Sequence, residues 1–575
     1  MCGICALLNA SSLQTGNFLH HCKILNHRGP DFCGLAHCNY TDTNGKTAYH
    51  MLGHTRLAIV SPNSGMQPIY NPTTDSLLAV NGEIYNYKQI LAEHSNISPV
   101  TGSDCEAIMI MFNNFTQMTS HEIITKLNKL RGMFAFILID KKTGAFLIAR
   151  DPIGIIPLYY AFGHNGLWVA SELKVIKNYY YGDIFSPGHY LYYNPTNSKA
   201  TNDNGSLNIV PYYQARIDNG WKLHNCKLSY DKTKQILLQK LQGAVRSHLM
   251  TDVPFGCLLS GGLDSSIIAS MVGHIIDKDT TLHTFSVGLV GSPDLKAARE
   301  MVTYLEQFCT VKHHEINFTV QQAIDLLYIV IYHLETFDCT TIRASTPMII
   351  LAMYIKSINI KMVLSGEGAD ELFGGYLHFK QAPNSLEFGA ECERLMLNLH
   401  RKDCLRANKS TMAAGVELRV PFLDTDVVDF VMSINPEYKM CSDKIEKQLL
   451  RETCKDLLPE SIYARQKEQF SDGVGYNWVD SIKEYAEQKY PHFNIDEACN
   501  IYPIKTPRTA EEFLYRNIFN EIFEPNEMTM MNWINNTVSW EKSISCSSEK
   551  ALQWSKEWQN RADPSGRSLD HHNSS

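Results

Sequence analysis

The run Ser260-Gly261-Gly262-Leu263-Asp264-Ser265-Ser266 carries the sharpest chemical signal in the sequence. It lies between a strand-like apolar stretch, Phe255 to Leu259, and a helix-like stretch, Asp264 to Ile276. Glycines let backbone N–H groups approach an anion, hydroxyls add donors, and a helix N-terminus adds its positive dipole end. The run therefore predicts a phosphate-binding loop, although it lacks the lysine of a Walker A loop. The alternative is a Gly-Ser turn in which Asp264 or Ser265 only caps the helix.

Cys2 is a candidate nucleophile because of its place in the chain. If Met1 is removed, the Cys2 thiol lies beside a free α-amine, whose ordinary pKa of roughly 7.7 to 8.0 suits it to accept the thiol proton. A thiolate attacks amide carbonyls, so this pair predicts amide chemistry, and the alternative is an inert buried cysteine. Cys5 completes a C-x-x-C with Cys2, but the apolar alternation around it indicates a strand. Residues three apart on a strand point to opposite faces, so we expect no shared metal or redox pair.

Polar residues at three other places in the N-terminal half could bind a small polar substrate. Asn81-Gly82-Glu83 follows the apolar run Leu77 to Val80, and a side-chain amide beside an unhindered backbone N–H can stabilise an oxyanion. Asn-Gly is also a common hairpin turn. Arg56 lies in a strand-like run, where an unpaired charge is costly, and Asp104 opens a helix-like run. The alternatives for these two are a surface salt bridge and an N-cap.

Carboxylates in the C-terminal half occur where a phosphoryl site would place them. Glu367 follows the apolar run Met362 to Leu364, at the carboxyl end of an expected parallel strand, where open α/β sheets bind ligands. Asp264 and Asp370 can hold Mg²⁺ on a triphosphate, because Mg²⁺ takes one or two carboxylates plus phosphate oxygens. Asp294 is placed to support the same region. The alternative for Glu367 is a helix-capping acid.

The elements that must position these residues form two blocks. The first consists of short strand-like runs with turn signals, interrupted by one helical stretch at Asp104 to Phe115. In the second, strands and helices alternate, which predicts a parallel sheet wrapped by helices, and the pattern beyond Asp370 is mostly helical. We therefore expect an α/β protein of two domains, at 1–210 and 230–545, with a polar linker at 211–229 and a tail at 546–575.

Composition excludes several classes of protein. The 52 Lys and Arg against 60 Asp and Glu give a net charge of −8, so there is no basic surplus for nucleic acid or anionic lipid. No apolar stretch approaches the ~20 residues of a membrane span, and the N-terminus lacks the charge and length of a secretory signal. The 16 cysteines have no disulfide-framework spacing. We expect an intracellular, cytoplasmic protein without nucleic-acid or membrane partners.

A family resemblance follows from these motifs. The loop at 260–266 is similar to the pyrophosphatase loop of ATP enzymes that cleave between the α- and β-phosphates and make acyl-adenylates. Three further segments narrow it: Gly291-Ser292-Pro293-Asp294, Thr340 to Pro347, and Ser365 to Tyr376. With Cys2 and the tail motif Ala562 to Arg567, the chain resembles the glutamine-hydrolysing asparagine synthetases of the eukaryotic type over nearly its whole length.

The resemblance implies a fold and a set of residues. The N-terminal half would be an Ntn-hydrolase αββα sandwich of the class II glutamine amidotransferases, and the C-terminal half an α/β ATP-pyrophosphatase-type parallel sheet with helices. Catalytic roles would fall to Cys2, Asn81, Gly82 and Glu367, and Mg²⁺ would lie at Asp264 and Asp370. Glutamine would be held by Arg56, Leu57, Ala58, Ile59, Val60, Asn81, Gly82, Glu83 and Asp104, with Arg56 on its carboxylate and Glu83 and Asp104 on its ammonium group. ATP would be held by Leu258, Ser260, Gly261, Gly262, Asp264, Ser265, Ser266, Val287, Ser365, Gly366 and Lys467, the last offsetting charge on departing pyrophosphate.

The implied reaction is ATP-dependent synthesis of L-asparagine from L-aspartate with ammonia released from L-glutamine. It would pass through β-aspartyl-AMP, give AMP, pyrophosphate and L-glutamate as co-products, and use a protected passage for ammonia; a homodimer is compatible with it. One alternative is a related amidotransferase or adenylating enzyme acting on another carboxylate, which the intact Thr340 to Pro347 disfavours. Another is a glutamine- or nucleotide-sensing protein without turnover, which the presence of Cys2, Asp264 and Glu367 disfavours.

Overall fold

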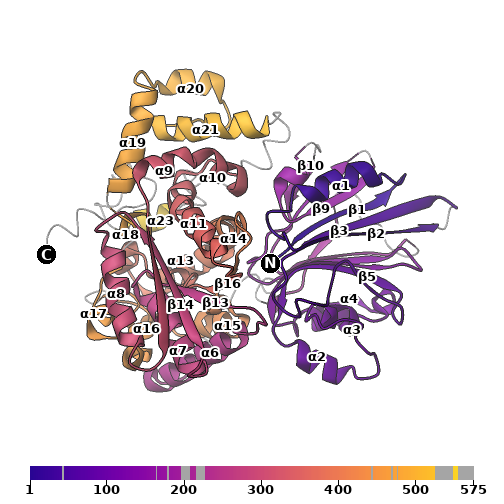
Figure 1. Ribbon diagram of the computed structural model, residues 1–575, viewed down its shortest axis with the longest axis horizontal. Coiled ribbons are helices and arrows are strands. Elements are labelled where there is room, and N and C mark those ends of the chain that lie inside the picture. The colour runs from indigo at the N-terminus through magenta and orange to yellow at the C-terminus, as the bar shows by residue number, and fades with distance from the viewer. Residues whose placement is uncertain are drawn as a thin grey trace.

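The computed structural model divides into two lobes that meet along one interface (Figure 1). It describes residues 1–41, 45–163, 165–177, 181–195, 207–214, 227–441, 445–467, 470–475, 477–524 and 548–554. The N-terminal lobe contains two antiparallel sheets, and the C-terminal lobe contains one parallel sheet surrounded by helices.

The N-terminal lobe is a four-layer sandwich. Its first sheet has the strand order β10-β8-β9-β1-β3-β2 and its second has the order β12-β11-β7-β6-β5-β4. Helix α1 covers the first sheet, and α2, α3 and α4 cover the second (Figure 1). This is the αββα sandwich expected from the resemblance. The elements are β1 (Gly3–Ala10), α1 (Thr15–Lys23), β2 (Phe32–Thr41), β3 (Thr47–Arg56), β4 (Ile69–Asn71), β5 (Ser76–Ile84), α2 (Tyr87–Glu93), α3 (Glu106–Met111), α4 (Ser120–Leu127), β6 (Gly132–Asp140), β7 (Phe146–Arg150), β8 (Tyr159–Gly163), β9 (Gly166–Ala170), β10 (Tyr181–Ile184), β11 (His189–Tyr193) and β12 (Ile209–Pro211).

Strand β1 explains why the apolar runs of this lobe are continuous. Ile4 and Ala6 face the core between the two sheets, whereas Cys5 and Leu7 face the smaller core under α1. Because both faces of the strand are covered, successive residues are apolar rather than alternating with polar ones. Cys5 therefore packs toward α1, on the face of the strand opposite to that of Ile4.

The C-terminal lobe is built on a five-stranded parallel sheet with the order β15-β14-β13-β16-β17. From β13 the chain adds β14 and β15 on one side, and then returns to add β16 and β17 on the other side. Strands β13 and β16 are therefore parallel neighbours although more than 100 residues separate them. Such a switch point leaves a crevice at the carboxyl ends of the two strands. The sheet and its main helices are β13 (Phe255–Leu258), β14 (Thr281–Gly288), β15 (Thr310–Asn317), β16 (Met362–Leu364), β17 (Glu417–Arg419), α6 (Tyr230–His248), α7 (Leu263–Ile275), α8 (Pro293–Leu305) and α11 (Cys339–Ser357).

The chain beyond Asp370 is mostly helical, as its pattern predicts, with the short edge strand β17 as the exception. Helices α19, α20 and α21 form a layer at the top of the C-terminal lobe in the view of Figure 1, and α14 lies at the interface with the N-terminal lobe. The remaining helices are α9 (Val320–Asp325), α10 (Leu327–Leu334), α12 (Ala369–Phe373), α13 (Ser385–Asn398), α14 (Asp403–Met412), α15 (Thr425–Ser433), α16 (Gln448–Thr453), α17 (Glu460–Tyr463), α18 (Phe470–Gly473), α19 (Asn477–Lys489), α20 (Ile495–Ile501), α21 (Ala510–Phe523) and α23 (Glu549–Leu552).

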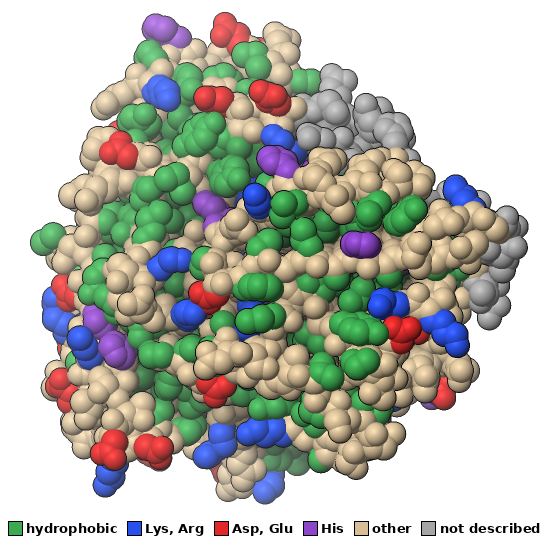
Figure 2. Space-filling view, turned by 45° about the vertical axis from the view of Figure 1, so that its right-hand side comes forward, with side chains coloured by type: hydrophobic (Ala, Val, Ile, Leu, Met, Phe, Trp, Pro, Cys, Tyr) green, Lys and Arg blue, Asp and Glu red, His purple; other side chains and the backbone are tan. Residues whose placement is uncertain are grey.

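The expected domain limit at residue 210 falls inside β12. Tyr212 and Tyr213 still pack into the core of the N-terminal lobe, and α6 begins the C-terminal lobe at Tyr230. Residues 215–226 of the expected linker and the tail motif Ala562 to Arg567 lie outside the described residues. None of the described helices is long and apolar enough to cross a membrane. On the face displayed in Figure 2, acidic and basic side chains are interspersed.

Candidate active sites

Cys2 lies just before β1, buried at the edge of the inter-lobe contact. Its backbone N–H donates to Asn81 Oδ1 at 2.8 Å, and its Sγ accepts from the Leu57 N–H at 3.4 Å. Burial raises the pKa of the Cys2 thiol, while the nearby amino terminus and the Leu57 N–H oppose that rise. In this chain Met1 is present and its ammonium group pairs with Glu417, so the nitrogen of Cys2 is a peptide nitrogen. The amine expected to act as a base therefore requires loss of Met1.

Asn81 and Gly82 lie on β5, directly beside Cys2. Asn81 uses its oxygen on the Cys2 N–H and donates from Nδ2 to Ser171 Oγ at 3.2 Å. Gly82 has φ +138°, and a Cβ there would lie 2.0 Å from the Met133 carbonyl oxygen, so only glycine fits. The strand thus places an amide and an unhindered backbone N–H next to the thiol, and the Asn-Gly pair is not a hairpin turn.

Arg56 ends β3 and is buried, which excludes a surface salt bridge. Its guanidinium donates to the carbonyl oxygens of Val60, Ser61 and Pro62 at 3.3, 2.9 and 3.2 Å. These bonds close the loop that follows β3, which includes Leu57, Ala58 and Ile59 and wraps around the Cys2 thiol. In this arrangement the Arg56 guanidinium fixes the conformation of the loop that borders the Cys2 site.

Glu83 and Asp104 are buried acids on the other side of the Cys2 site. Glu83 lies 3.4 Å from Arg419 Nη2 of the other lobe, and Asp104 accepts from the Ile84 N–H at 2.7 Å. Helix α3 begins at Glu106 with Cys105 as its N-cap, so Asp104 does not cap it. Burial, together with the Glu417 and Asp104 carboxylates, raises the pKa of Glu83 well above its ordinary value. A ligand with a positive charge would relieve this excess of buried acid.

The loop at 260–266 joins β13 to α7, as expected. Gly261 has φ +70°, and a Cβ there would lie 2.4 Å from the backbone of Ala297. Ser260 Oγ lies 3.1 Å from Ser265 Oγ and accepts from the Gly262 N–H at 3.2 Å, so the hydroxyls fix the loop from within. The loop leaves the first N–H groups of the 13-residue helix α7 at the cavity, which suits an anion.

Two aspartates and two lysines form a row of ion pairs beside this loop. Lys447 Nζ is 2.5 Å from Asp264 Oδ2 and 2.6 Å from Asp370 Oδ1, and Lys467 Nζ is 2.6 Å from Asp370 Oδ2. Burial alone would raise the pKa of Asp370, but the two ammonium groups hold it well below its usual range. The two aspartates fit a shared divalent cation, because one ammonium group already bridges them and Asp264 Oδ1 is buried without a hydrogen-bond partner among the described residues.

Glu367 follows β16 on the other side of the switch point. Its Oε1 accepts from Arg406 Nη2 at 2.6 Å, and Arg406 also pairs with Asp403 at 2.9 Å. Burial raises the pKa of Glu367 to about 7, against the attraction of Arg406. A carboxyl group with this pKa can both donate and accept a proton near neutral pH.

One cavity of about 260 Å³ is lined by the loop, by the row of aspartate–lysine ion pairs and by Glu367. It reaches the backbone ends of β13, β14 and β16 and, at its side, Thr340 and Thr341 of α11. Gly261 and Ser266 are not in its wall: Gly261 packs on Ala297, and Ser266 is buried below the loop. The predicted residues in its wall are Leu258, Ser260, Gly262, Asp264, Ser265, Val287, Asp294, Ser365, Gly366, Glu367, Asp370 and Lys467.

Sequence reasoning missed most of the basic residues of this cavity. Lys447, Arg406 and Arg465 line it, and Arg465 Nη2 contacts Asp294 Oδ1 at 2.7 Å. None belongs to a local motif that reveals a phosphate site, although Arg465 lies only two residues before Lys467. Lys447 has φ +60°, a left-handed conformation that is rare for lysine and common at functional sites.

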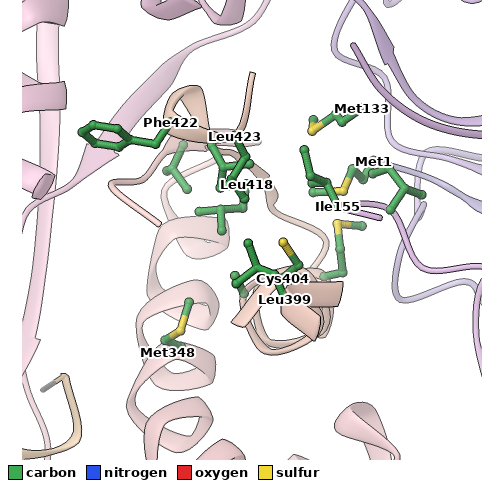
Figure 3. Packing of buried hydrophobic residues seen from close by; sticks show 14 of the residues in the cluster. Met1, Met133, Ile155, Met348, Leu399, Cys404, Leu418, Phe422 and Leu423 are labelled. Carbon is green, nitrogen blue, oxygen red and sulfur yellow. The ribbon is translucent and has the colours of Figure 1, made fainter. Parts of the chain in front are cut away.

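A buried apolar cluster lies between the two sites (Figure 3). Met1, Met133 and Ile155 project from the N-terminal lobe toward Leu399, Cys404 and Leu418 of the C-terminal lobe. All six side chains are less than 8% exposed. The labelled side chains at this contact between the lobes are therefore apolar and closely packed.

Two family models match this sequence. The asparagine synthase model matches residues 237–390 and 380–554, and the glutamine amidotransferase domain model matches residues 1–191. An asparagine synthetase (glutamine-hydrolyzing) of Zea mays is 42% identical over 593 residues, which cover 100% of this chain and 94% of that protein. Asparagine synthetase B (glutamine-hydrolyzing) of Escherichia coli strain K12 is 44% identical over 573 residues, which cover 96% of this chain and 95% of that protein.

Proposed function

The chain belongs to the glutamine-hydrolysing asparagine synthetases, and on that premise we propose that it makes L-asparagine from L-aspartate, ATP and the amide nitrogen of L-glutamine. AMP, pyrophosphate and L-glutamate are the co-products. The observation that carries the proposal is the single cavity in which the 260–266 loop, the paired aspartates and Glu367 meet, in the same chain as the Cys2 site.

In the N-terminal lobe, the Cys2 thiolate attacks the side-chain amide of glutamine, the C–N bond breaks, and ammonia leaves as the thioester forms. Water then hydrolyses the thioester to glutamate and frees the thiol. The α-amine that loss of Met1 would free takes the thiol proton. Asn81 and Gly82 stabilise the oxyanion, Arg56 binds the glutamine carboxylate, and Glu83 and Asp104 bind its ammonium group. This last role is supported by the excess of buried acid on that side of the site. The loop residues from Leu57 to Val60 complete the pocket.

In the C-terminal lobe, the β-carboxylate of aspartate attacks the α-phosphorus of ATP, and pyrophosphate leaves. The 260–266 loop and the α7 N-terminus hold the phosphates, and Lys467 offsets the charge on pyrophosphate. Asp264 and Asp370 would hold Mg²⁺, which when bound neutralises phosphate charge. The backbone at Leu258, Val287, Ser365 and Gly366 borders the adenosine. Glu367 assists adenylate formation and takes a proton as ammonia displaces AMP.

Ammonia moves from the first site to the second inside the protein. In water at neutral pH it is mostly ammonium, which cannot attack the adenylate. Apart from Met1, which the proposed mechanism removes, the side chains labelled in Figure 3 between the lobes are apolar and buried, which supports a protected route.

The test is product analysis with glutamine, ATP and a panel of carboxylic acids. We expect asparagine, AMP and pyrophosphate in equal amounts with aspartate, and no amide from the other acids. Amide formed from another carboxylate would favour the related amidotransferase, and binding of glutamine or ATP without any product would favour a sensor. ADP and phosphate as products would exclude the adenylate.

The domain limits, the location in the cell and the assembly are also proposals. We place the glutaminase activity in residues 1–210 and the synthetase activity in residues 230–545. We expect the enzyme in the cytoplasm, and a homodimer is the assembly to test for. Size-exclusion chromatography with light scattering would decide the assembly.

A further inference from the structure

Helix α14 is an element that touches both candidate active sites. Arg406, on this helix, donates from Nη2 to Glu367 Oε1 at 2.6 Å. Two residues further on, Asn408 Oδ1 accepts from Arg28 Nη2 of the N-terminal lobe at 2.9 Å. Residues two apart on a helix differ in direction by about 200°, so the two side chains leave opposite faces of the helix. Helix α14 therefore lies between the sites, with one side chain reaching toward each.

Arg28 links α14 to Cys2 by hydrogen bonds. It is fully buried, and its guanidinium donates to three segments: from Nε to the Cys2 carbonyl oxygen at 2.9 Å, from Nη1 to Glu172 Oε1 at 2.8 Å and from Nη2 to Asn408 Oδ1 at 2.9 Å. A guanidinium is a rigid planar fork, so a shift of one acceptor alters its bonds to the others. The Cys2 backbone is thus tied to the position of Asn408.

We propose that α14 couples the two sites, with Asn408 as a positioning residue that orients Cys2 through Arg28 and follows, through Arg406, the occupancy of the Glu367 cavity. The inference rests on the proposed function, because it takes Cys2 as the glutaminase nucleophile and the cavity as the site for ATP and aspartate. Substrates that fill the cavity change the partners of Glu367 and Arg406. Since α14 is packed on both sides, a change at Arg406 shifts the helix as a unit and moves Asn408 against Arg28.

The chain offers a matched set of variants. Asn408→Leu has nearly the same size and removes the acceptor oxygen. Asn408→Asp keeps an acceptor for Arg28 but loses the amide donor that bonds the Ile155 carbonyl oxygen at 3.3 Å, and the active enzyme lacks the Met1 contact in either case. Ser410→Ala is the control on the same helix, because Ser410 is fully buried and its hydroxyl has no hydrogen-bond partner among the described residues.

The experiment measures kcat and KM for glutamine hydrolysis in the full-length protein, with the cavity empty and with it filled by aspartate and a non-cleavable α,β-methylene analogue of ATP. We expect filling to change kcat/KM of the wild type by about fivefold or more, the lower range of coupling between sites. Asn408→Asp and Ser410→Ala should retain that change. Asn408→Leu should lose it and hydrolyse glutamine more slowly in both states, with an unfolding temperature close to that of Asn408→Asp.

An unchanged response in Asn408→Leu, or no response in an active wild type, would overturn the coupling. Loss of both activities and of stability in Asn408→Leu and Asn408→Asp alike would also overturn it, because Asn408 would then only hold the lobes together. A wild type that hydrolyses no glutamine but is stable and binds the analogue would instead overturn the proposed function.

Discussion

Glu83 at the Cys2 site and Asp370 in the cavity of the other lobe are buried acids whose pKa values shift in opposite directions. At the Cys2 site, the buried acids Glu83 and Glu417 share the guanidinium of Arg419, and Glu417 also pairs with the amino terminus. In the cavity of the other lobe, Asp264 and Asp370 each pair with a lysine at 2.5 to 2.6 Å. As a result, the pKa of Glu83 is raised and the pKa of Asp370 is lowered.

This difference matches the ligands that we propose for each site. A site with an excess of buried acid is stabilised by a ligand that brings a positive charge, such as the ammonium group of an amino acid. A site whose lysines are already held by carboxylates is prepared for phosphates, which can take over the lysines while a metal ion takes over the carboxylates. Variants at each site can show whether these two chemistries are separable.

Cys2→Ala should remove glutamine-dependent synthesis and leave synthesis from added ammonium salt intact. The loss should be on the order of 10³-fold or more, because the variant has no nucleophile. Asparagine formation from each nitrogen source is the measurement, with Cys5→Ala as the control, since Cys5 packs toward α1. Glutamine-dependent synthesis that persists in Cys2→Ala would place the nucleophile elsewhere.

Glu367→Gln should remove synthesis and leave glutamine hydrolysis intact, because it replaces the carboxylate of the second site by an amide of the same size. Asparagine formation from either nitrogen source should fall by about 10²- to 10⁴-fold, the usual contribution of one acid or base, while glutamine hydrolysis continues. Near-normal ammonia-dependent synthesis in this variant would reduce Glu367 to a capping acid.

Glu511→Ala tests the ion pair of Arg343, a residue of the segment Thr340 to Pro347 that does not line the cavity. Arg343, within Thr340 to Pro347, is buried and makes a bidentate pair with Glu511 of α21 at 2.8 and 2.5 Å. Removal of one partner leaves a buried charge and should cost about 3 to 5 kcal/mol of stability in the C-terminal lobe. Urea unfolding is the measurement, and the exposed Glu521→Ala on the same helix is the control. Equal midpoints for the two variants would contradict this account.

The pH dependence of adenylate formation should follow Glu367. Its pKa is raised to about 7, so the carboxylate form that accepts a proton increases as pH rises through 7 and is lost as pH falls below it. Aspartate-dependent exchange of pyrophosphate into ATP should therefore increase up to tenfold per pH unit below this pKa and level off above it. Glu367→Gln should show a flat profile, and a wild-type limb near pH 4 would disagree with the burial of this group.

Lys361→Ala should have the smallest effect. Lys361 pairs with Asp31 across the lobes at 2.7 Å, but both side chains are about one-third exposed. Partly exposed ion pairs contribute about 1 kcal/mol at most, so the unfolding temperature should hardly change and both activities should persist. A large loss of glutaminase activity would show that this contact, rather than Arg28, ties the lobes together near Cys2.

Local patterns in the sequence were enough to predict much of this molecule. The strand-loop-helix at 260–266 has its glycines, hydroxyls and flanking elements within about 20 residues, and the apolar run after Cys2 predicts the strand that contains Cys5. The αββα sandwich and the parallel sheet of the C-terminal lobe are as expected. The short edge strand β17 was missed, because three residues carry no usable periodicity.

The rest depends on contacts between distant segments. Lys447 pairs with Asp264 across 183 residues, and Arg28 meets Asn408 across 380. No local spacing encodes such pairs, because only the fold brings them together. Asp104 was open to an N-cap interpretation for the same reason: its carboxylate accepts from Ile84 on β5 instead of from its own helix.

The central claim is that ammonia made at Cys2 is used at Glu367 of the same chain, and mixing two variants tests it most directly. Cys2→Ala keeps only the second site and Glu367→Gln keeps only the first. With glutamine, aspartate and ATP present, and with free ammonia continuously removed by a coupled dehydrogenase, the mixture should make less than about one-tenth of the asparagine made by the wild type, because a route through the apolar cluster does not connect different molecules. Synthesis by the mixture at close to half the wild-type rate would contradict the internal route.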